Sequence, residues 1–201
     1  MTLSEFDLIK HYFSDCGAGR DDVVLGVGDD AALLCTPDGI ELAVTLDTLI
    51  EGVHFLPGTD PESLGYKALA VNLSDLAAMG AEAAWVTLSL SLPMSDADWV
   101  AAFSDGFCAL ARQFGVRLVG GDTTRGPLAV SVSANGLVPV GQALRRRGSQ
   151  CGDLIFVTGT VGDAGLGLKA ILEQVTVEDP EYLRRRLERP QPRLAVGQAL
   201  R

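Results

Sequence analysis

Aspartates placed where strands and turns are expected to end are the residues of this sequence best suited to chemistry. Gly26-Val27-Gly28-Asp29-Asp30 sets two adjacent carboxylates at the mouth of a glycine-rich turn. Adjacent carboxylates repel one another, and a cation or a ring of hydrogen-bond donors offsets that repulsion. A pair that merely caps the turn is the alternative, and for two aspartates taken alone it is the commoner situation.

The segments that follow are expected to bring further oxygen ligands to this turn. Residues 31–35 predict a short buried strand, and residues 40–46 a second strand that runs straight into Asp47; a tight turn with Pro and Gly joins them. If the two strands form a hairpin, Asp30 lies opposite Thr45. Oxygen ligands from several segments, without Cys or His among them, suit a hard cation, and Mg2+ first.

A third carboxylate is expected on a helix. Asp60-Pro61-Glu62 has the N-cap, first-turn proline and acidic first turn of a helix that should end near Gly80. Asp75 shares an i, i+4 column with Val71, so we expect it to face inward. A buried carboxylate is costly unless it is paired or coordinates a metal, which favours a functional role over a structural one.

A fourth carboxylate, Asp122, follows another short strand. Residues 116–119 predict the strand, and Gly120-Gly121-Asp122-Thr123-Thr124 follows it. Glycines let a ligand approach the backbone N–H groups, while Asp122 and the two threonine hydroxyls offer oxygen ligands.

Two further candidates are basic or titratable. His54 follows the acidic end of the second strand by seven residues. A lone histidine is more often structural than functional, but its place beside the acids favours function. Arg145-Arg146-Arg147 is either a solvated face or a phosphate clamp, and the sequence does not decide between them.

The remaining pattern predicts an α+β protein, because strands and helices alternate without strict strand–helix–strand repeats. Gly159 to Gly167 resembles a phosphate cradle but lacks both GxGxxG and GxxxxGK[ST], so packing glycines are the favoured interpretation. The other expected elements are a helix over 4–13 capped by Ser4, strands over 83–92, 128–140 and 153–158, and helices over 95–115, 168–173 and 178–201, the last broken at Pro190 and Pro192.

Composition limits the function classes. The chain has 201 residues, 47% of them hydrophobic, and a net charge of −10, which argues against a nucleic-acid or anionic-membrane surface. The four cysteines show no CxxC spacing, so reduced, packed cysteines are expected. No apolar run approaches 18 residues and no signal peptide is evident, so a soluble, cytoplasmic protein is expected. The sequence stops in mid-helix, which predicts a fragment of a longer protein.

These motifs together resemble the thiamine-monophosphate kinase family, which belongs to the superfamily of aminoimidazole ribonucleotide synthetase and selenophosphate synthetase. The resemblance runs through all 201 residues in order, and the Asn72-to-Gly80 block is its specific part. The motifs that carry it are Gly26-Val27-Gly28-Asp29-Asp30, Asp47-Thr48, His54-Phe55, the block from Tyr66 to Gly80, and Gly120-Gly121-Asp122-Thr123-Thr124-Arg125-Gly126-Pro127.

The resemblance implies a fold and a division into domains. It implies a mixed sheet with helices on one face, which forms a β-barrel at a homodimer interface. Residues 1–140 would be an amino-terminal domain for metal binding, ATP binding and dimerisation, 141–152 a linker, and 153–201 the beginning of a second α+β domain. The family's later Ser-Asp-Gly segment would lie beyond Arg201.

The resemblance also implies a reaction: ATP phosphorylates thiamine monophosphate to thiamine diphosphate, with several Mg2+ ions. The implied metal ligands are Asp30, Thr45, Asp47, Asp75 and Asp122, the implied ATP contacts are Gly121, Asp122 and Arg146, and the implied substrate contact is His54. Where the family often has Thr, this chain has Leu46, whose backbone carbonyl can bind but which offers no hydroxyl ligand. Phosphoryl transfer needs alignment and charge neutralisation more than covalent participation, so direct in-line transfer is the expected mechanism.

Two alternatives remain open beside the kinase. One is a sibling ATP-dependent enzyme with another substrate, against which His54 and the Asn72-to-Gly80 block weigh. The other is a non-catalytic, dimerising fragment that binds Mg-nucleotide.

Overall fold

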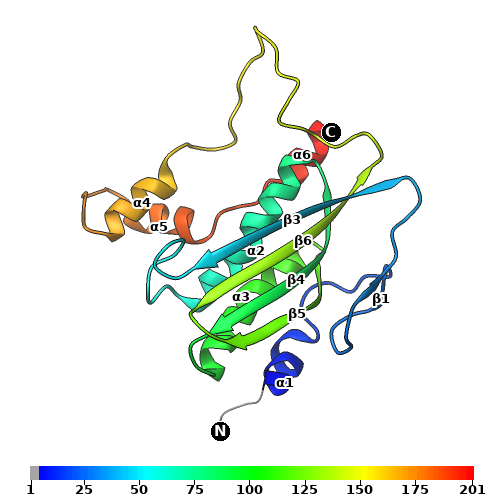
Figure 1. Cartoon of the computed structure of the whole chain (residues 1–201). Coiled ribbons are helices and arrows are strands. Elements are labelled where there is room, and N and C mark those ends of the chain that lie inside the picture. Colours follow the sequence, from blue (N-terminus) through cyan, green and yellow to red (C-terminus); the bar gives the residue numbers. More distant parts are fainter. Residues whose placement is uncertain (1–4) are drawn as a thin grey trace.

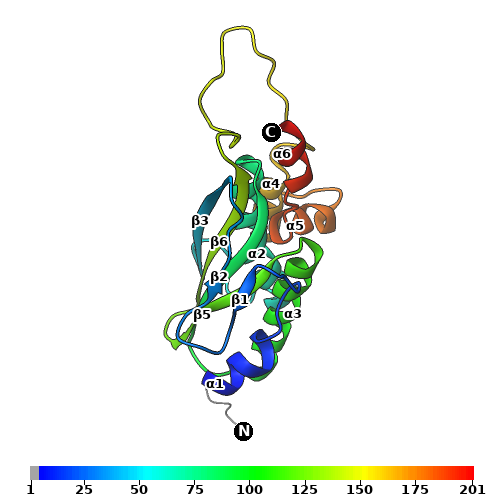
Figure 2. The same ribbon diagram turned by 90° about the vertical axis from the view of Figure 1, so that its right-hand side faces the viewer.

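The computed structural model describes residues 5–201 as a mixed four-stranded sheet with its main helices on one face (Figures 1 and 2). The strand order is β3-β6-β4-β5. β3, β6 and β4 are antiparallel neighbours, whereas β4 and β5 are parallel. The strands are β3 (Ile40–Ile50), β4 (Glu82–Leu92), β5 (Arg117–Arg125) and β6 (Ala129–Pro139).

Helices α2 (Pro61–Ala78) and α3 (Ala97–Gln113) cover one face of the sheet, and both begin where the sequence predicts. The Asp60 carboxylate accepts a hydrogen bond from the Ser63 backbone N–H at 2.9 Å, which caps α2. Asp96 caps α3 in the same way. The predicted alternation of β4 is also confirmed, because Leu88, Leu90 and Leu92 are buried against the helices while Ser89 is exposed.

The expected hairpin of residues 31–46 is wrong. β2 (Leu33–Leu34) pairs instead with β1 (Val23–Leu25) in a separate two-stranded sheet. β3 pairs along all of its eleven residues with β6, and this long ladder satisfies far more backbone groups than the short hairpin could. The expected burial of residues 31–35 is wrong as well, since Leu33 is 55% exposed.

The amino-terminal helix consists of α1 (Glu5–Leu8) and a π-helical turn, η1 (Ile9–Phe13). The predicted cap, Ser4, lies outside the described residues. The expectation of four reduced cysteines is wrong for two of them, because Cys16 and Cys108 form a disulfide between the end of this segment and α3. Their separation of 92 residues hides the pair from any spacing motif.

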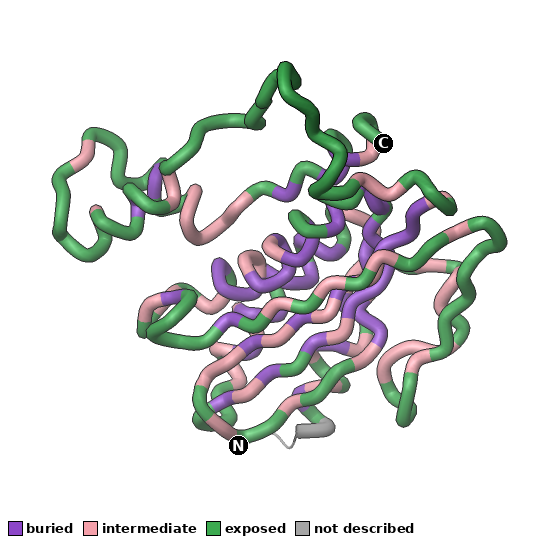
Figure 3. The backbone as a smooth tube through the Cα atoms, turned by 45° about the horizontal axis from the view of Figure 1, so that its top comes forward, coloured by how far each residue is buried: buried purple, intermediate pink, exposed green. Residues whose placement is uncertain are grey.

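The carboxy-terminal part forms α4 (Asp163–Ile171), α5 (Pro180–Glu188) and α6 (Leu194–Leu200). The break between α5 and α6 lies at the two prolines, as predicted. The expected strand over 153–158 is absent from the described structure: residues 145–162 are exposed throughout (Figure 3). A strand needs a partner for its backbone groups, and no neighbouring strand of this chain pairs with this segment.

The carboxy-terminal helix α6 lies against the segment that joins α2 to β4. The Gln198 side chain donates a hydrogen bond to the Ala81 backbone oxygen at 3.3 Å, and Arg201 donates to the Gly80 backbone oxygen at 3.0 Å. The α6 segment therefore contacts the expected amino-terminal domain directly. The division at residues 141–152 stays a prediction, although that stretch contains neither helix nor strand.

The second face of the sheet carries apolar side chains that the chain leaves exposed. Leu42, Val44 and Leu46 of β3 are 47%, 61% and 65% exposed. The expected β-barrel is not formed within the described residues, because β3 and β5 are open edges of one sheet. None of the helices in the described part of the chain is long and apolar enough to cross a membrane.

Candidate functional site

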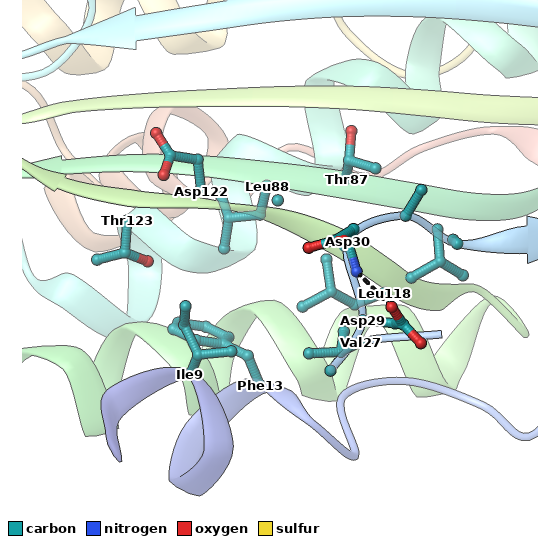
Figure 4. A pocket seen from close by; sticks show the side chains of 16 residues that line it. Ile9, Phe13, Val27, Asp29, Asp30, Thr87, Leu88, Leu118, Asp122 and Thr123 are labelled. Atoms are coloured by element: carbon teal, nitrogen blue, oxygen red, sulfur yellow. Dashed lines mark hydrogen bonds between the residues drawn. The ribbon is translucent and has the colours of Figure 1, made fainter. Parts of the chain in front are cut away.

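A cavity of about 680 Å3 lies between the Asp29-Asp30 turn, the amino-terminal helical segment and strand β5 (Figure 4). Both Asp30 and Asp122 line it, so the structure brings together two of the carboxylates that the sequence singles out. The apolar floor comes from Leu118 and from Ile9 and Phe13 of η1. A volume of this size suits a small-molecule ligand.

Gly121 makes this cavity possible by letting two strands approach closely. β5 does not end at Val119 as expected but continues through the glycines to Arg125. At Gly121 the φ angle is +153°, and a Cβ there would lie 1.8 Å from the Leu88 backbone oxygen of β4. Only glycine fits this position, and Asp122 follows it on the exposed face of the sheet opposite Ser89.

The two adjacent aspartates of the turn have different roles. The Asp29 carboxylate accepts a hydrogen bond from the Asp30 backbone N–H at 2.8 Å, which is the turn-capping role of the alternative interpretation. The Asp30 carboxylate has no hydrogen-bond partner among the described residues and lines the cavity. The pair therefore divides into one structural carboxylate and one that is available for a cation.

A second acidic group lies at the β3 edge of the sheet. The Thr45 hydroxyl donates a hydrogen bond to the Asp75 carboxylate at 2.8 Å. Burial and the neighbouring Asp75 carboxylate raise the pKa of Asp47, an effect that His54 opposes. The expectation that Asp75 faces the core is wrong, because Asp75 is exposed. The face of α2 that carries Asp75 lies beside the edge strand β3, so the Asp75 side chain reaches the margin of the sheet.

The predicted metal ligands therefore form two separate groups. Asp30 and Asp122 lie at the β5 edge, while Thr45, Asp47 and Asp75 lie at the β3 edge. Three strand spacings separate these edges, about 14 Å. No three acidic, histidine or cysteine side chains in the described residues converge on one metal position. Within the described residues these five side chains do not share one position, because the expected hairpin does not form, and their roles as Mg2+ ligands stay predictions.

Each group nevertheless has the chemistry of a Mg2+ site. The donors are carboxylate and hydroxyl oxygens, which a hard cation prefers. Mg2+ is commonly held by only one or two carboxylates, with substrate phosphates and water completing the octahedron. Two carboxylates at each edge fit that requirement.

His54 belongs to the β3 edge. Its Nδ1 accepts a hydrogen bond from the Ile50 backbone N–H at 3.1 Å, so in the neutral ring the proton is on Nε2. Its backbone oxygen accepts a hydrogen bond from the Lys67 ammonium at 3.2 Å. Burial lowers the pKa of Lys67, and nearby Glu188 opposes this shift. The sequence pattern did not single out Lys67, which only the packing of α2 brings to this loop.

Neither Arg146 nor Asn72 lies in the two acidic groups. Arg146 lies in the exposed segment after β6 and does not line the cavity that contains Gly121. Asn72 is completely buried; its amide donates to the Ala68 backbone oxygen at 3.1 Å, while its Oδ1 has no partner within the described structure. The ATP contact of Arg146 stays a prediction.

The Gly159-to-Gly167 loop shows the packing role that the sequence favours. Gly167 lies against α5, where a Cβ would approach the Leu183 backbone oxygen to 2.5 Å. Sequence reasoning missed the arginines of α5, although the run Arg184-Arg185-Arg186 was a visible signal.

Comparison with known proteins agrees with the motifs. Residues 28–138 match the family model described as AIR synthase related protein, N-terminal domain. A thiamine-monophosphate kinase from Salmonella typhimurium is 51% identical over 100% of this chain, which spans 63% of that relative's length.

Solved structures of thiamine-monophosphate kinases are also similar to this chain. Thiamine-monophosphate kinase from Stenotrophomonas maltophilia K279a is 54% identical with a TM-score of 0.85, over 90% of this chain and 60% of that one. A complex of AaThiL with AMPPCP and TMP is 32% identical with a TM-score of 0.76, over 87% of this chain and 57% of that one. These likenesses confirm the α+β fold and the resemblance to thiamine-monophosphate kinases. Because the family model covers more than half of its residues, the chain belongs to the AIR synthase related family.

Proposed function

We propose that this protein takes part in ATP-dependent phosphorylation of thiamine monophosphate to thiamine diphosphate. The observation that carries the proposal is the pair Asp30 and Asp122 facing one cavity beside the close approach at Gly121. Two carboxylates beside a glycine-rich strand suit an anionic nucleotide only through cations, because the chain itself is acidic. The named kinases that match the whole chain, and the likeness to a complex with an ATP analogue and TMP, support the same substrates.

The residues of each edge would have different tasks. Asp30 and Asp122 would hold Mg2+ against the ATP phosphates, and the Gly121 backbone together with Arg146 would contact the nucleotide. Thr45, Asp47 and Asp75 would hold further Mg2+, and His54 would contact the thiamine phosphate.

The proposed chemistry is direct in-line transfer between two phosphates. Bound Mg2+ supplies charge neutralisation, which lets two anions approach. The carboxylates fix the positions of the phosphates, and the Leu118, Ile9 and Phe13 side chains keep water from one wall of the cavity. Transfer from a chiral γ-phosphate should therefore invert its configuration, and retention would contradict a single direct step.

We further propose a homodimer that joins the two acidic groups. The exposed apolar row of Leu42, Val44 and Leu46 offers a surface for a second copy. A twofold arrangement can place the β3 edge of one chain beside the β5 edge of the other. Each complete site would then take Asp122 from one chain and Asp75 from its partner.

The first experiment is chromatographic. The chain is incubated with Mg-ATP and thiamine monophosphate, and thiamine diphosphate and ADP are quantified together. Equal amounts of both products are expected. ADP alone would indicate a nucleotide site with a different acceptor, and neither product would favour the alternative of a non-catalytic, Mg-nucleotide-binding dimer.

The joined site has its own test by mixing two inactive variants. Asp122→Asn and Asp75→Asn should each abolish Mg-ATP binding and product formation. If the site is shared, unfolding and refolding the two together should restore about a quarter of the wild-type activity, because half of the dimers are mixed and each has one intact site. If each site lies within one chain, the mixture stays inactive.

A further inference from the structure

A second cavity, of about 460 Å3, lies between the start of α2, the loop before α4, and α5. Its wall differs from that of the first cavity, because basic and hydroxyl side chains dominate it. Four arginines of one short stretch line it, together with a threonine and a tyrosine: Arg185, Arg186, Arg189, Arg193, Thr160 and Tyr182.

The positive charge of this cavity is only partly balanced. Arg186 pairs with Asp163 at 3.2 Å, and Arg189 pairs with Glu62 at 2.9 Å. Within the described residues, the side chains of Arg185 and Arg193 have neither an ion pair nor a hydrogen bond. Two guanidinium groups without an ion pair thus line the same cavity, in a chain whose net charge is −10. Like charges held together in this way favour an anionic ligand.

Internal hydrogen bonds hold the cavity wall in place before any ligand arrives. The Asp163 carboxylate accepts hydrogen bonds from the Tyr182 hydroxyl at 2.8 Å, from Arg186 at 3.2 Å and from the Thr160 hydroxyl. The Arg189 guanidinium lies over the Tyr66 ring, 5.6 Å from its centroid. Side chains fixed in this manner lose little conformational entropy when a ligand binds.

We propose that this cavity binds the phosphoryl group of a small ligand. Guanidinium forks match phosphate oxygens, and the volume suits a small phosphate ester as well as free phosphate. The polar, basic wall excludes an apolar ligand. The cavity is separate from the Asp30–Asp122 cavity, and its function does not depend on the phosphorylation proposed above.

Calorimetric titration of the 201-residue chain with inorganic phosphate tests the site. We expect saturable binding of one phosphate per chain, weakened about tenfold by Arg185→Gln and again by Arg193→Gln, since each removes one charge-assisted contact. Arg184→Gln is the matched control: it removes the same charge from the same helix, but Arg184 pairs with Glu188 and does not line the cavity. Its affinity for phosphate should equal that of the wild type.

The outcomes separate the possibilities. No binding at millimolar phosphate, or an equal loss in Arg184→Gln, would overturn the site. Titration with AMP of the Asp122→Asn variant, in which the proposed nucleotide site of the first cavity is disabled, distinguishes the two sources of the phosphoryl group: binding tighter than that of free phosphate would indicate an ester, and equal or weaker binding would indicate phosphate itself. Asp122→Asn should leave phosphate affinity unchanged, and a loss there would mean that the phosphate binds in the first cavity instead.

Discussion

Asp22 anchors the segment that carries the Asp29-Asp30 turn, and its removal should destabilise the protein measurably. The carboxylate accepts hydrogen bonds from Arg20 at 2.6 Å and from the Trp85 indole N–H at 2.9 Å. Asp22→Asn keeps one oxygen for Trp85 but turns an amide N–H2 or a neutral oxygen toward the guanidinium. The half-buried Arg20 charge then loses its partner, retaining the Gly115 backbone oxygen as an acceptor.

The expected loss follows from these contacts. A hydrogen bond to a charged group contributes about 1.5–3 kcal/mol, and both side chains are largely shielded, with 15% and 20% of their surfaces exposed. We expect the free energy of unfolding to fall by about 2 kcal/mol. For a chain of this length that lowers the melting temperature by about 4–8 °C.

The pH dependence of the same pair has a definite sign. The hydrogen bond from Arg20, followed by that from Trp85, holds the pKa of Asp22 below its usual value. Its stabilisation is therefore complete above the unfolded pKa of about 4 and is lost as the pH falls through the folded value. The difference in melting temperature between wild type and Asp22→Asn should be constant near neutral pH and should shrink below about pH 4.

Thermal unfolding followed by tryptophan fluorescence makes this measurement, with Asp21→Asn as the control. Asp21 is the exposed neighbour and carries the same charge. Its replacement should change the free energy of unfolding by less than about 0.5 kcal/mol. Equal melting temperatures for Asp22→Asn and the wild type, or a difference that grows as the pH falls, would refute the reasoning.

Three further predictions concern the backbone, the disulfide and the exposed sheet face. Gly121→Ala should lower the free energy of unfolding by more than about 3 kcal/mol, because its Cβ would lie 1.8 Å from a backbone oxygen of β4. Gly120→Ala is the control: the nearest atom to its Cβ is 4.0 Å away, so it should lower the free energy of unfolding by about 1 kcal/mol or less. Equal losses for the two variants in urea unfolding would contradict this. Reduction of the Cys16–Cys108 disulfide, which spans 92 residues, should lower stability by about 4–5 kcal/mol in the loop-entropy account, and a melting temperature insensitive to dithiothreitol would contradict it. Leu46→Asp should give a folded monomer in sedimentation, because it sets a charge on a side chain that is 65% exposed; an unchanged dimer would place the interface elsewhere.

Local rules explain why much of the fold is predictable from the sequence. The start of α2 follows from Asp60 and Pro61, and the two faces of β4 follow from strict alternation. These features depend on residues a few positions apart, so the sequence contains all the information that they need. The motifs also led to the correct family.

The pairings between distant segments could not be predicted from the sequence. Turn chemistry at Gly39 is visible in the sequence, and the chain does turn there with φ +76°. Whether that turn closes a hairpin depends on which partner offers β3 the longer ladder, and β6 lies far along the chain. The disulfide, the arginine-lined cavity and the Lys67 contact with the His54 loop are similarly long-range.

The sequence by itself determined which residues offer the oxygen atoms that a metal prefers, since that depends on side-chain chemistry. Asp30, Asp47, Asp75 and Asp122 were all predicted from it as oxygen ligands. Only the tertiary structure decided that they form two groups at opposite edges of one sheet, because strand order sets those positions. Strand order results from competition among all possible ladders and from burial of one sheet face, and no local spacing encodes either.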